Sequence, residues 1–135
     1  MSTKESGLGF SVAVDNALGA AKTISNDVLS LNFSTPRAEQ DVTGVDKSAN
    51  ERLLLLADMQ VDLTVAFNDA ADQAHSVFST VSSTSVARTT TLGISGKSLP
   101  GELLYTDYSF SRSASGEFVA TCPGVLADGT VPTWA

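Results

Sequence analysis

The chain has 135 residues, 42% of them hydrophobic and 17% charged, and its net charge is −7 at pH 7. This length suits one domain with a real core, so we expect a single domain over residues 1–135. The acidic balance argues against a nucleic-acid binder, because such proteins cluster Lys and Arg on the phosphates. The low charged fraction leaves two explanations open, a surface covered by partner subunits or one rich in neutral Ser and Thr.

The cysteine content and the apolar runs exclude two further classes of protein. Cys122 is the only cysteine, so no intrachain disulfide can form and a small buried hydrophobe is its expected role. The first ten residues lack a basic region followed by an apolar run, so no secretory signal is predicted. The longest apolar run is Leu53–Ala57, far short of the roughly 20 residues of a membrane helix, so no membrane partner is expected.

Two alternating strands are predicted near the N-terminus. The apolar positions of the first are Phe10, Val12 and Val14. Those of the second are Leu29, Leu31 and Phe33. The turn residues of Asp15–Gly19 lie between them, so the two strands are expected to form a hairpin.

A long loop is predicted over about residues 35–50. It contains Pro36, Gly44, three acidic and two basic residues, and it is longer than compact domains usually tolerate without a purpose. It is either a binding arm or an exposed excursion, and the apolar anchors Val42 and Val45 favour the arm. Ser48, with Glu51 three residues later, predicts a helical turn. Leu53–Leu56 is apolar on all sides, so its period does not distinguish helix from strand.

The clearest strand of the sequence spans residues 59–67. Its apolar positions, expected to face the core, are Met59, Val61, Leu63, Val65 and Phe67. Its other face carries Gln60, Asp62, Thr64 and Ala66. Strict alternation of this kind is typical of a strand with one buried and one polar face.

A helix is predicted over about residues 69–82. Asn68 is its expected N-cap, and Asp69 and Asp72 would lie in the first turn, where the helix dipole favours acidic side chains. Its apolar stripe is Ala70, Ala74, Val77, Phe78 and Val81. His75 lies off this stripe, which indicates a surface or packing role.

The C-terminal third predicts further strands. One is Thr-rich and spans Val86–Ile94, and another alternates over residues 103–110. A turn at Ser113–Gly116 links it to a last long strand with apolar positions Phe118, Ala120 and Cys122. Together, the predicted strands, helix and loop indicate a mainly β fold, which is a β-sandwich or small barrel with one flanking helix and one long loop.

Residues that could perform chemistry do not converge anywhere in this sequence. Gly7-Leu8-Gly9 lacks the third glycine and the helix start of a phosphate-binding loop. The spacing of Glu51, Asp58 and Asp62 does not match a metal or glycosidase site. The single histidine has no ligand-spaced neighbour. We therefore predict neither an enzyme nor a bound cofactor or metal.

Several short segments occur in a recognisable order. The second strand opens with Ile24-Ser25-Asn26-Asp27-Val28, and the loop contains Asp41-Val42-Thr43 and Asp46-Lys47-Ser48-Ala49. The alternating strand is preceded by Leu56-Ala57-Asp58 and followed by Asn68-Asp69 and the predicted helix. The closing strands contain Gly101-Glu102-Leu103 and Phe118-Val119-Ala120. In this order and spacing, over residues 10–121, the chain resembles the tail tube proteins, or major tail proteins, of long-tailed bacteriophages.

This resemblance implies a structural virion protein with a β-sandwich fold and one flanking helix. Six copies would form a ring, and stacked rings would form the hollow tail tube that conducts the genome to the host. It implies a place in the virion tail, synthesis in the host bacterial cytoplasm, and other tail proteins, such as the tape measure and the tail terminator, as partners. Phage DNA would pass through without specific binding.

The resemblance also assigns candidate assembly residues. The loop that reaches the next ring would contain Pro36, Arg37, Glu39, Asp41, Val42, Val45, Asp46 and Lys47. Candidates for the lumen-facing side chains are Gln60, Asp62, Thr64 and Asp107, which could equally lie on the tube exterior. An acidic balance suits a conduit for DNA, because like charges do not bind.

A β-sandwich binding module of another class, either a capsid decoration protein or a carbohydrate-binding domain, is the alternative. Sugar binding needs an exposed aromatic platform, and beyond six phenylalanines the chain offers only Trp134, Tyr105 and Tyr108. Trp134 lies at the extreme C-terminus, where docking on a neighbour or disorder is expected.

Overall fold

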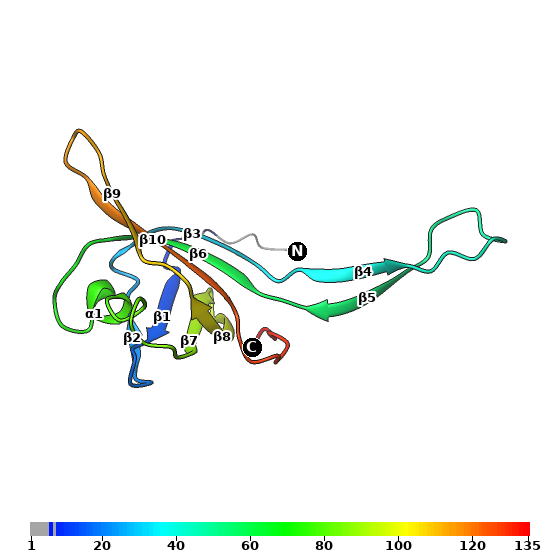
Figure 1. Ribbon diagram of the computed structural model, residues 1–135, viewed down its shortest axis with the longest axis horizontal. Helices are drawn as coiled ribbons and strands as arrows, with labels where there is room; N and C mark the ends of the chain where they lie inside the picture. Colours follow the sequence, from blue (N-terminus) through cyan, green and yellow to red (C-terminus); the bar gives the residue numbers. More distant parts are fainter. Residues whose placement is uncertain (1–5, 7) are drawn as a thin grey trace.

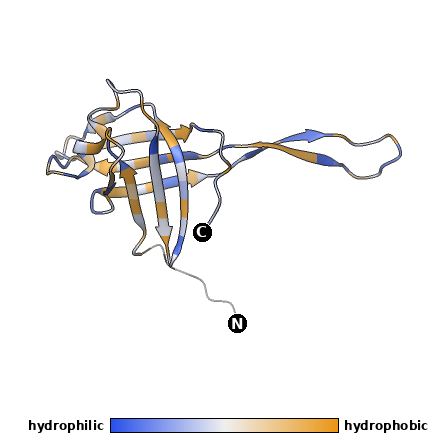
Figure 2. Ribbon diagram, turned by 90° about the horizontal axis from the view of Figure 1, so that it is seen from below, coloured by the Kyte–Doolittle hydropathy of each residue, from blue (hydrophilic) through white to orange (hydrophobic). Residues whose placement is uncertain are grey.

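The computed structural model describes residue 6 and residues 8–135, whose strands form two layers that cross over a common core (Figures 1 and 2). One layer contains β1 (Ser11–Asp15), β2 (Ala21–Thr23), β7 (Arg88–Ile94) and β8 (Lys97–Tyr105). The other contains β3 (Val28–Ser34), β6 (Gln60–Ala66), β9 (Ser109–Arg112) and β10 (Phe118–Leu126). The remaining elements are the hairpin of β4 (Arg37–Asp41) and β5 (Arg52–Ala57), and the helix α1 (Ala74–Phe78).

Both layers belong to one antiparallel sheet in the order β2-β1-β7-β8-β10-β6-β3, with β9 paired to β10. The sheet passes from one layer to the other where β10 pairs with only the last three residues of β8. Gly124 lies at this crossing, where a Cβ would come within 3.0 Å of the Tyr105 ring. The sheet is not closed, since β2 and β3 are its two ends. Of the two predicted architectures, the sandwich with a flanking helix is confirmed and the barrel is wrong.

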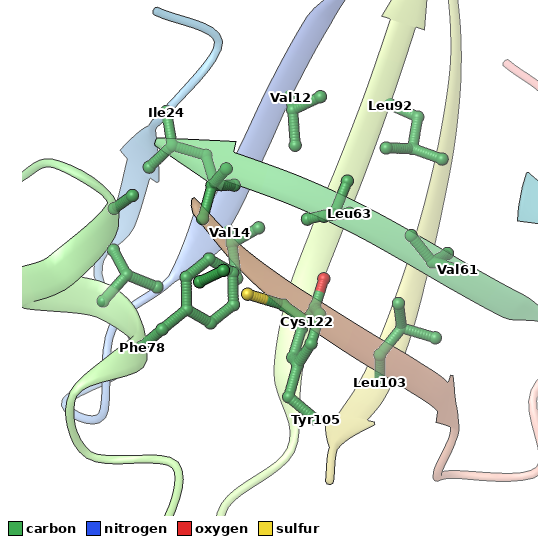
Figure 3. Close-up of a cluster of buried hydrophobic side chains, with 14 of the residues drawn as sticks. Val12, Val14, Ile24, Val61, Leu63, Phe78, Leu92, Leu103, Tyr105 and Cys122 are labelled. Carbon is green, nitrogen blue, oxygen red and sulfur yellow. The ribbon is translucent and has the colours of Figure 1, made fainter. Parts of the chain in front are cut away.

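Alternating side chains of both layers fill the core, as Figure 3 shows. Met59, Val61, Leu63 and Val65 are at most 2% exposed, which confirms the predicted inner face of β6. They meet Val12 and Val14 of β1, Leu92 of β7, Leu99, Leu103 and Tyr105 of β8, and Ala120 and Cys122 of β10. Cys122 is fully buried, as predicted. Strand periodicity therefore builds most of the core, and Ala74, Val77 and Phe78 of α1 complete it.

The N-terminal hairpin differs from the prediction. β1 pairs with the three-residue β2 and with β7, whereas the strand that contains Leu31 and Phe33 is β3, which pairs with β6 in the other layer. A register shift between Val28 and Ser30 turns Leu29 outward, while Leu31 and Phe33 still pack against the core. A β-bulge adds one residue and so reverses the expected alternation at this point.

The helix is much shorter than predicted. It spans five residues, no acidic side chain lies in its first turn, and Asp72 adopts a left-handed φ of 62°. Asn68 is not the N-cap: its side chain accepts the Ala70 N–H in a local turn. The buried carboxylate of Asp27 instead accepts the Ala74 N–H at 3.0 Å and the Asn68 side-chain amide at 2.8 Å. An acceptor from a distant segment thus fixes where the helix begins.

Three further boundaries differ from those expected. The Thr-rich strand begins at Arg88, and residues 103–110 contribute to two strands, β8 and β9, separated by a break. The predicted loop of residues 35–50 is largely a hairpin, because β4 and β5 pair from Arg37↔Ala57 to Asp41↔Arg52. Leu53–Leu56 is therefore strand, and the helical turn predicted at Ser48 is absent.

Trp134 packs on Phe33 of its own chain, with ring centroids 6.1 Å apart.

The guanidinium of Arg88 is buried between α1 and the first layer. It donates to the carbonyl oxygen of Val77 at 2.9 Å, to that of Asp15 at 3.2 Å and to the Thr80 hydroxyl at 2.7 Å. Burial lowers the pKa of this guanidinium, and these three hydrogen bonds from its terminal nitrogens offset part of the cost of burying it. Arg88 thus ties the end of the helix to β1 and β7.

Replacing Arg88 by Ala is expected to lower the free energy of unfolding by about 3 kcal/mol, because buried carbonyls lose a charged donor. Denaturant unfolding of the purified chain measures this loss. The matched control, Arg112→Ala, removes an exposed arginine of β9 and should change stability by less than about 0.5 kcal/mol. Equal effects of the two substitutions would contradict the structural role of Arg88.

The buried Cys122 and Tyr105 and the partly buried Tyr108 predict how stability changes at alkaline pH. Burial raises the pKa of the Cys122 thiol and of the Tyr108 phenol to about 12, and it raises that of Tyr105 further. The unfolded thiol ionises near its ordinary value of 9.0, so above that pH the unfolded state binds fewer protons than the native state. Stability should be level from pH 7 to about 9 and fall progressively towards pH 12.

Cys122→Ala removes one of these three groups and should make that decline shallower by up to about 1.4 kcal/mol per pH unit. Urea unfolding of both proteins between pH 7 and 11 measures the slopes. If the free energy of unfolding falls equally steeply with pH in the two proteins, the Cys122 thiol is not buried as described.

Candidate assembly surfaces

The β4–β5 hairpin and its connecting loop project from the body as an arm over residues 35–58 (Figures 1 and 2). The arm continues the β3–β6 pair, since β3 leads into β4 and β5 leads into β6. At its base the Asp58 N–H donates to the Pro36 carbonyl at 2.9 Å, and the Arg37 guanidinium donates to the Leu55 carbonyl at 2.7 Å. These bonds join the two strands of the arm near its base.

The tip of the arm is ordered by its own polar side chains. The Asp41 carboxylate accepts the Thr43 N–H at 2.9 Å, and the Thr43 hydroxyl accepts the Glu51 N–H at 2.8 Å. The bonds from Thr43 hold the pKa of the Asp41 carboxyl below its usual value. The Val42 N–H donates to the Glu51 carbonyl at 2.9 Å, which closes the loop.

The arm exposes a run of leucines on both of its faces. Leu53, Leu54, Leu55 and Leu56 are 41–86% exposed, whereas all five residues of β4 are polar or small. An isolated two-stranded ribbon is marginally stable in water. Covering these four half-exposed side chains would contribute on the order of 1 kcal/mol each. The arm therefore has the properties of a segment that packs on another molecule.

The eight residues predicted for the inter-ring loop all lie on this arm and are exposed: Pro36, Arg37, Glu39, Asp41, Val42, Val45, Asp46 and Lys47. Leu53–Leu56, which supply most of the arm's exposed apolar surface, were not among the predicted residues. An unbroken apolar run beside an already predicted loop was the available signal. It was ambiguous, because a ribbon exposed on both faces has no buried face to impose a period.

A polar face covers the outside of the β3–β6–β10 layer. Cross-strand partners of an antiparallel sheet share a face, and the register pairs Asp62 with Asn32 and Pro123. The same registers place Ser30, Ser34, Gln60, Thr64, Thr121 and Val125 on this face. Asp62 is the one charged residue among these nine, and none is basic. Gln60, Asp62 and Thr64 are thus brought together as predicted.

Asp107 lies apart from the polar face. It is exposed in the segment between β8 and β9, where its carboxylate accepts the Tyr108 N–H at 2.8 Å. It borders a hollow of about 320 Å³ that is also lined by His75, Phe78 and Tyr108. The Asp107 carboxylate thus lies beside α1, on the inner side of the layer, and the structure does not join it to Asp62.

Within residues 8–135, no group of three or more His, Cys, Asp or Glu side chains is arranged to hold a metal ion. In the same part of the chain, no helix has the length and apolar character needed to cross a membrane.

Comparisons with known proteins identify similar folds. No model of a protein family matches the chain, and no curated protein matches it. Among solved structures, a chain of the tail of an empty gene transfer agent particle, determined with C6 helical symmetry, superposes with a TM-score of 0.73 at 16% identity. The match covers 98% of both chains. A chain of the native gene transfer agent virion gives 0.71 at 16% identity, over 96% of this chain and 99% of the other. The fold implied by the sequence resemblance is confirmed.

Proposed function

We propose that the chain is a structural subunit of a phage-type tail tube, in which six copies form a ring and the rings stack into a hollow tube. The observation that carries the proposal is the likeness to a C6-symmetric tail chain over 98% of both lengths. A match of this extent includes the arm as well as the body. The resemblance of the sequence to tail tube proteins supports the same role, which is structural rather than catalytic.

In this role the polar face of β3, β6 and β10 lines the lumen. A surface of Ser, Thr, Asn and Gln with one acid and no base offers DNA no cationic contacts, so a genome can pass without binding. Gln60, Asp62 and Thr64 form the centre of that lining. The opposite face of the same strands is buried in the core, so a single layer forms both the wall and the core.

The arm extends from a ring to the next one along the tube axis. Its four exposed leucines favour this role, since they would be covered by the neighbouring ring. The tube ends would contact other tail proteins, such as the tape measure and the tail terminator. The subunit would be made in the host bacterial cytoplasm before it enters the virion tail.

Negative-stain electron microscopy of the concentrated, purified chain tests the proposal. Hollow tubes or six-fold rings are expected. Discrete monomers or trimers under all conditions would contradict it and would favour the alternative of a decoration or carbohydrate-binding module.

Asp62→Lys tests the lumen face. The side chain is exposed on the polar face, so the subunit should fold and assemble, but every ring would gain six cationic groups on the path of the DNA. Genome delivery by particles with this variant is expected to fall at least about tenfold, with the largest loss at low salt, because phosphate contacts are salt-dependent. Asp128→Lys makes the same charge change at an exposed position after β10 and serves as the control. Normal tubes with normal delivery from Asp62→Lys would exclude the polar face as the lumen.

Shortening the arm tests its role between rings. Residues 38–56 are replaced by a short Gly-containing turn, which leaves the body intact. The free energy of unfolding of the subunit should change by less than about 1 kcal/mol, because the arm buries little of its own surface. Tube growth should stop at single rings, as measured by light scattering and microscopy. Tubes of wild-type length from the shortened chain would refute the assignment.

A further inference from the structure

The arm and the β9–β10 hairpin extend towards opposite ends of the molecule (Figure 1), and a cluster of exposed apolar side chains lies at each of these two ends. One end is the arm, with its four leucines. At the other end the β9–β10 hairpin extends past α1, and it carries an aromatic patch that consists of Phe67, Phe110 and Phe118. These three rings are 40%, 40% and 43% exposed. The proposed function uses the arm and leaves this patch without a role.

The aromatic patch is a preformed surface. The rings of Phe110 and Phe118 stack at 4.9 Å with an interplanar angle of 12°, and Phe67 lies 5.5 Å from Phe118. His75 and Tyr108 support the patch, with centroids 4.7 Å from Phe67 and 4.4 Å from Phe110 respectively. The patch continues the core face of the layer, because Phe110 is paired with the buried Ala120. Phe67 was predicted to face inward and is nevertheless 40% exposed, since no strand of the other layer covers it.

We propose that the aromatic patch of one subunit receives the leucine arm of a second copy of this chain in the neighbouring ring. This inference rests on the proposed tail tube function and names the docking site of the arm. Two different surfaces at opposite ends of one molecule make a heterologous contact, which repeats without closing and so builds an open filament. Each copy would offer its arm to one neighbouring ring and its patch to the other.

The charges beside the two surfaces are complementary. In the arm, Glu39 is the cross-strand partner of Leu54 and shares its face. In the β9–β10 hairpin, Arg112 is the cross-strand partner of Phe118 and shares its face. An acid therefore accompanies the leucines, and a base accompanies the aromatic rings. Glu39 has an exposed partner in its own arm, Arg52 at 3.8 Å, which is a weak contact that Arg112 could replace.

This pairing also selects which face of the arm docks. Leu54 shares the face of Glu39, because the two are cross-strand partners, and it is 62% exposed. Leu56 lies beyond the register shift between Arg37 and Glu39, so alternation does not place it on the same face. Leu54 is therefore the leucine that contacts Phe110 and Phe118.

Cysteine cross-linking between two differently marked subunits tests the contact. One subunit carries Leu54→Cys and the other Phe118→Cys, both at exposed positions, and the buried Cys122 stays in place. The two are mixed in equal amounts, assembled and oxidised. Arm-to-patch heterodimers are expected in tubes and not in unassembled subunits, at a yield at least about tenfold above the control pair. The control pair combines Leu54→Cys with Thr121→Cys, an exposed residue on the polar face of the same strand β10.

Wild-type chains that form no tubes or rings would overturn the proposed function and this inference with it. Wild-type tubes in which the arm cross-links equally to both positions, or preferentially to Thr121→Cys, would overturn the docking site alone. Cross-links in free subunits would also overturn it. If the patch captures another tail protein instead, Phe118→Cys would cross-link to that protein in whole particles and not to the arm.

Charge reversal gives an independent test that does not alter the apolar residues. Glu39→Arg and Arg112→Glu, each alone, should slow tube elongation about tenfold at low salt, because like charges would meet at the contact. The double variant restores the pair and should elongate within about twofold of the wild-type rate. A double variant as slow as the product of the two single effects would contradict the contact.

Discussion

The pairing of β6 with β3 on one edge and with β10 on the other is the constraint on which the rest of the structure depends. Along β6 one set of alternate side chains forms the core and the other set forms the polar face. The same β3–β6 pair continues beyond the body as the arm, while β10 continues the layer in the opposite direction to the aromatic patch. A register slip by one residue would expose the core side chains and bury Asp62. The core, the proposed lumen wall and the aromatic patch therefore belong to one sheet, and the separate β4–β5 hairpin of the arm continues from two of its strands.

Burial on one face made several parts of this layer predictable from sequence. Met59, Val61, Leu63 and Val65 have the period of two that a half-buried strand requires, and the structure buries all four. The predicted structure was wrong where contacts with residues distant in the sequence determine the local conformation. The helix begins at Ala74 because Asp27 supplies the acceptor, and its local sequence contains no sign of that contact. A bulge turned Leu29 outward, and Phe67 lies beyond the reach of the opposing layer.

The candidate site was only partly predictable for a related reason. Gln60, Asp62 and Thr64 were identified because a polar alternation is visible beside an apolar one. Leu53–Leu56 were missed because both of their faces are exposed in the subunit, so the sequence contains no alternation there. The aromatic patch was missed because its three rings come from β6, β9 and β10, and only the fold brings them together.

The exposed apolar surface of the proposed subunit is unfavourable until the subunit assembles. Such surface on a projecting ribbon invites aggregation, and we propose that the leucine arm and the aromatic patch cover each other in the tube. Helical reconstruction of tubes grown from the purified chain tests this claim most directly. The polar face is expected on the lumen, with Leu54 buried against Phe110 and Phe118 of the next ring. A reconstruction with the arm in solvent, or with Asp62 on the outer surface of the tube, would contradict it.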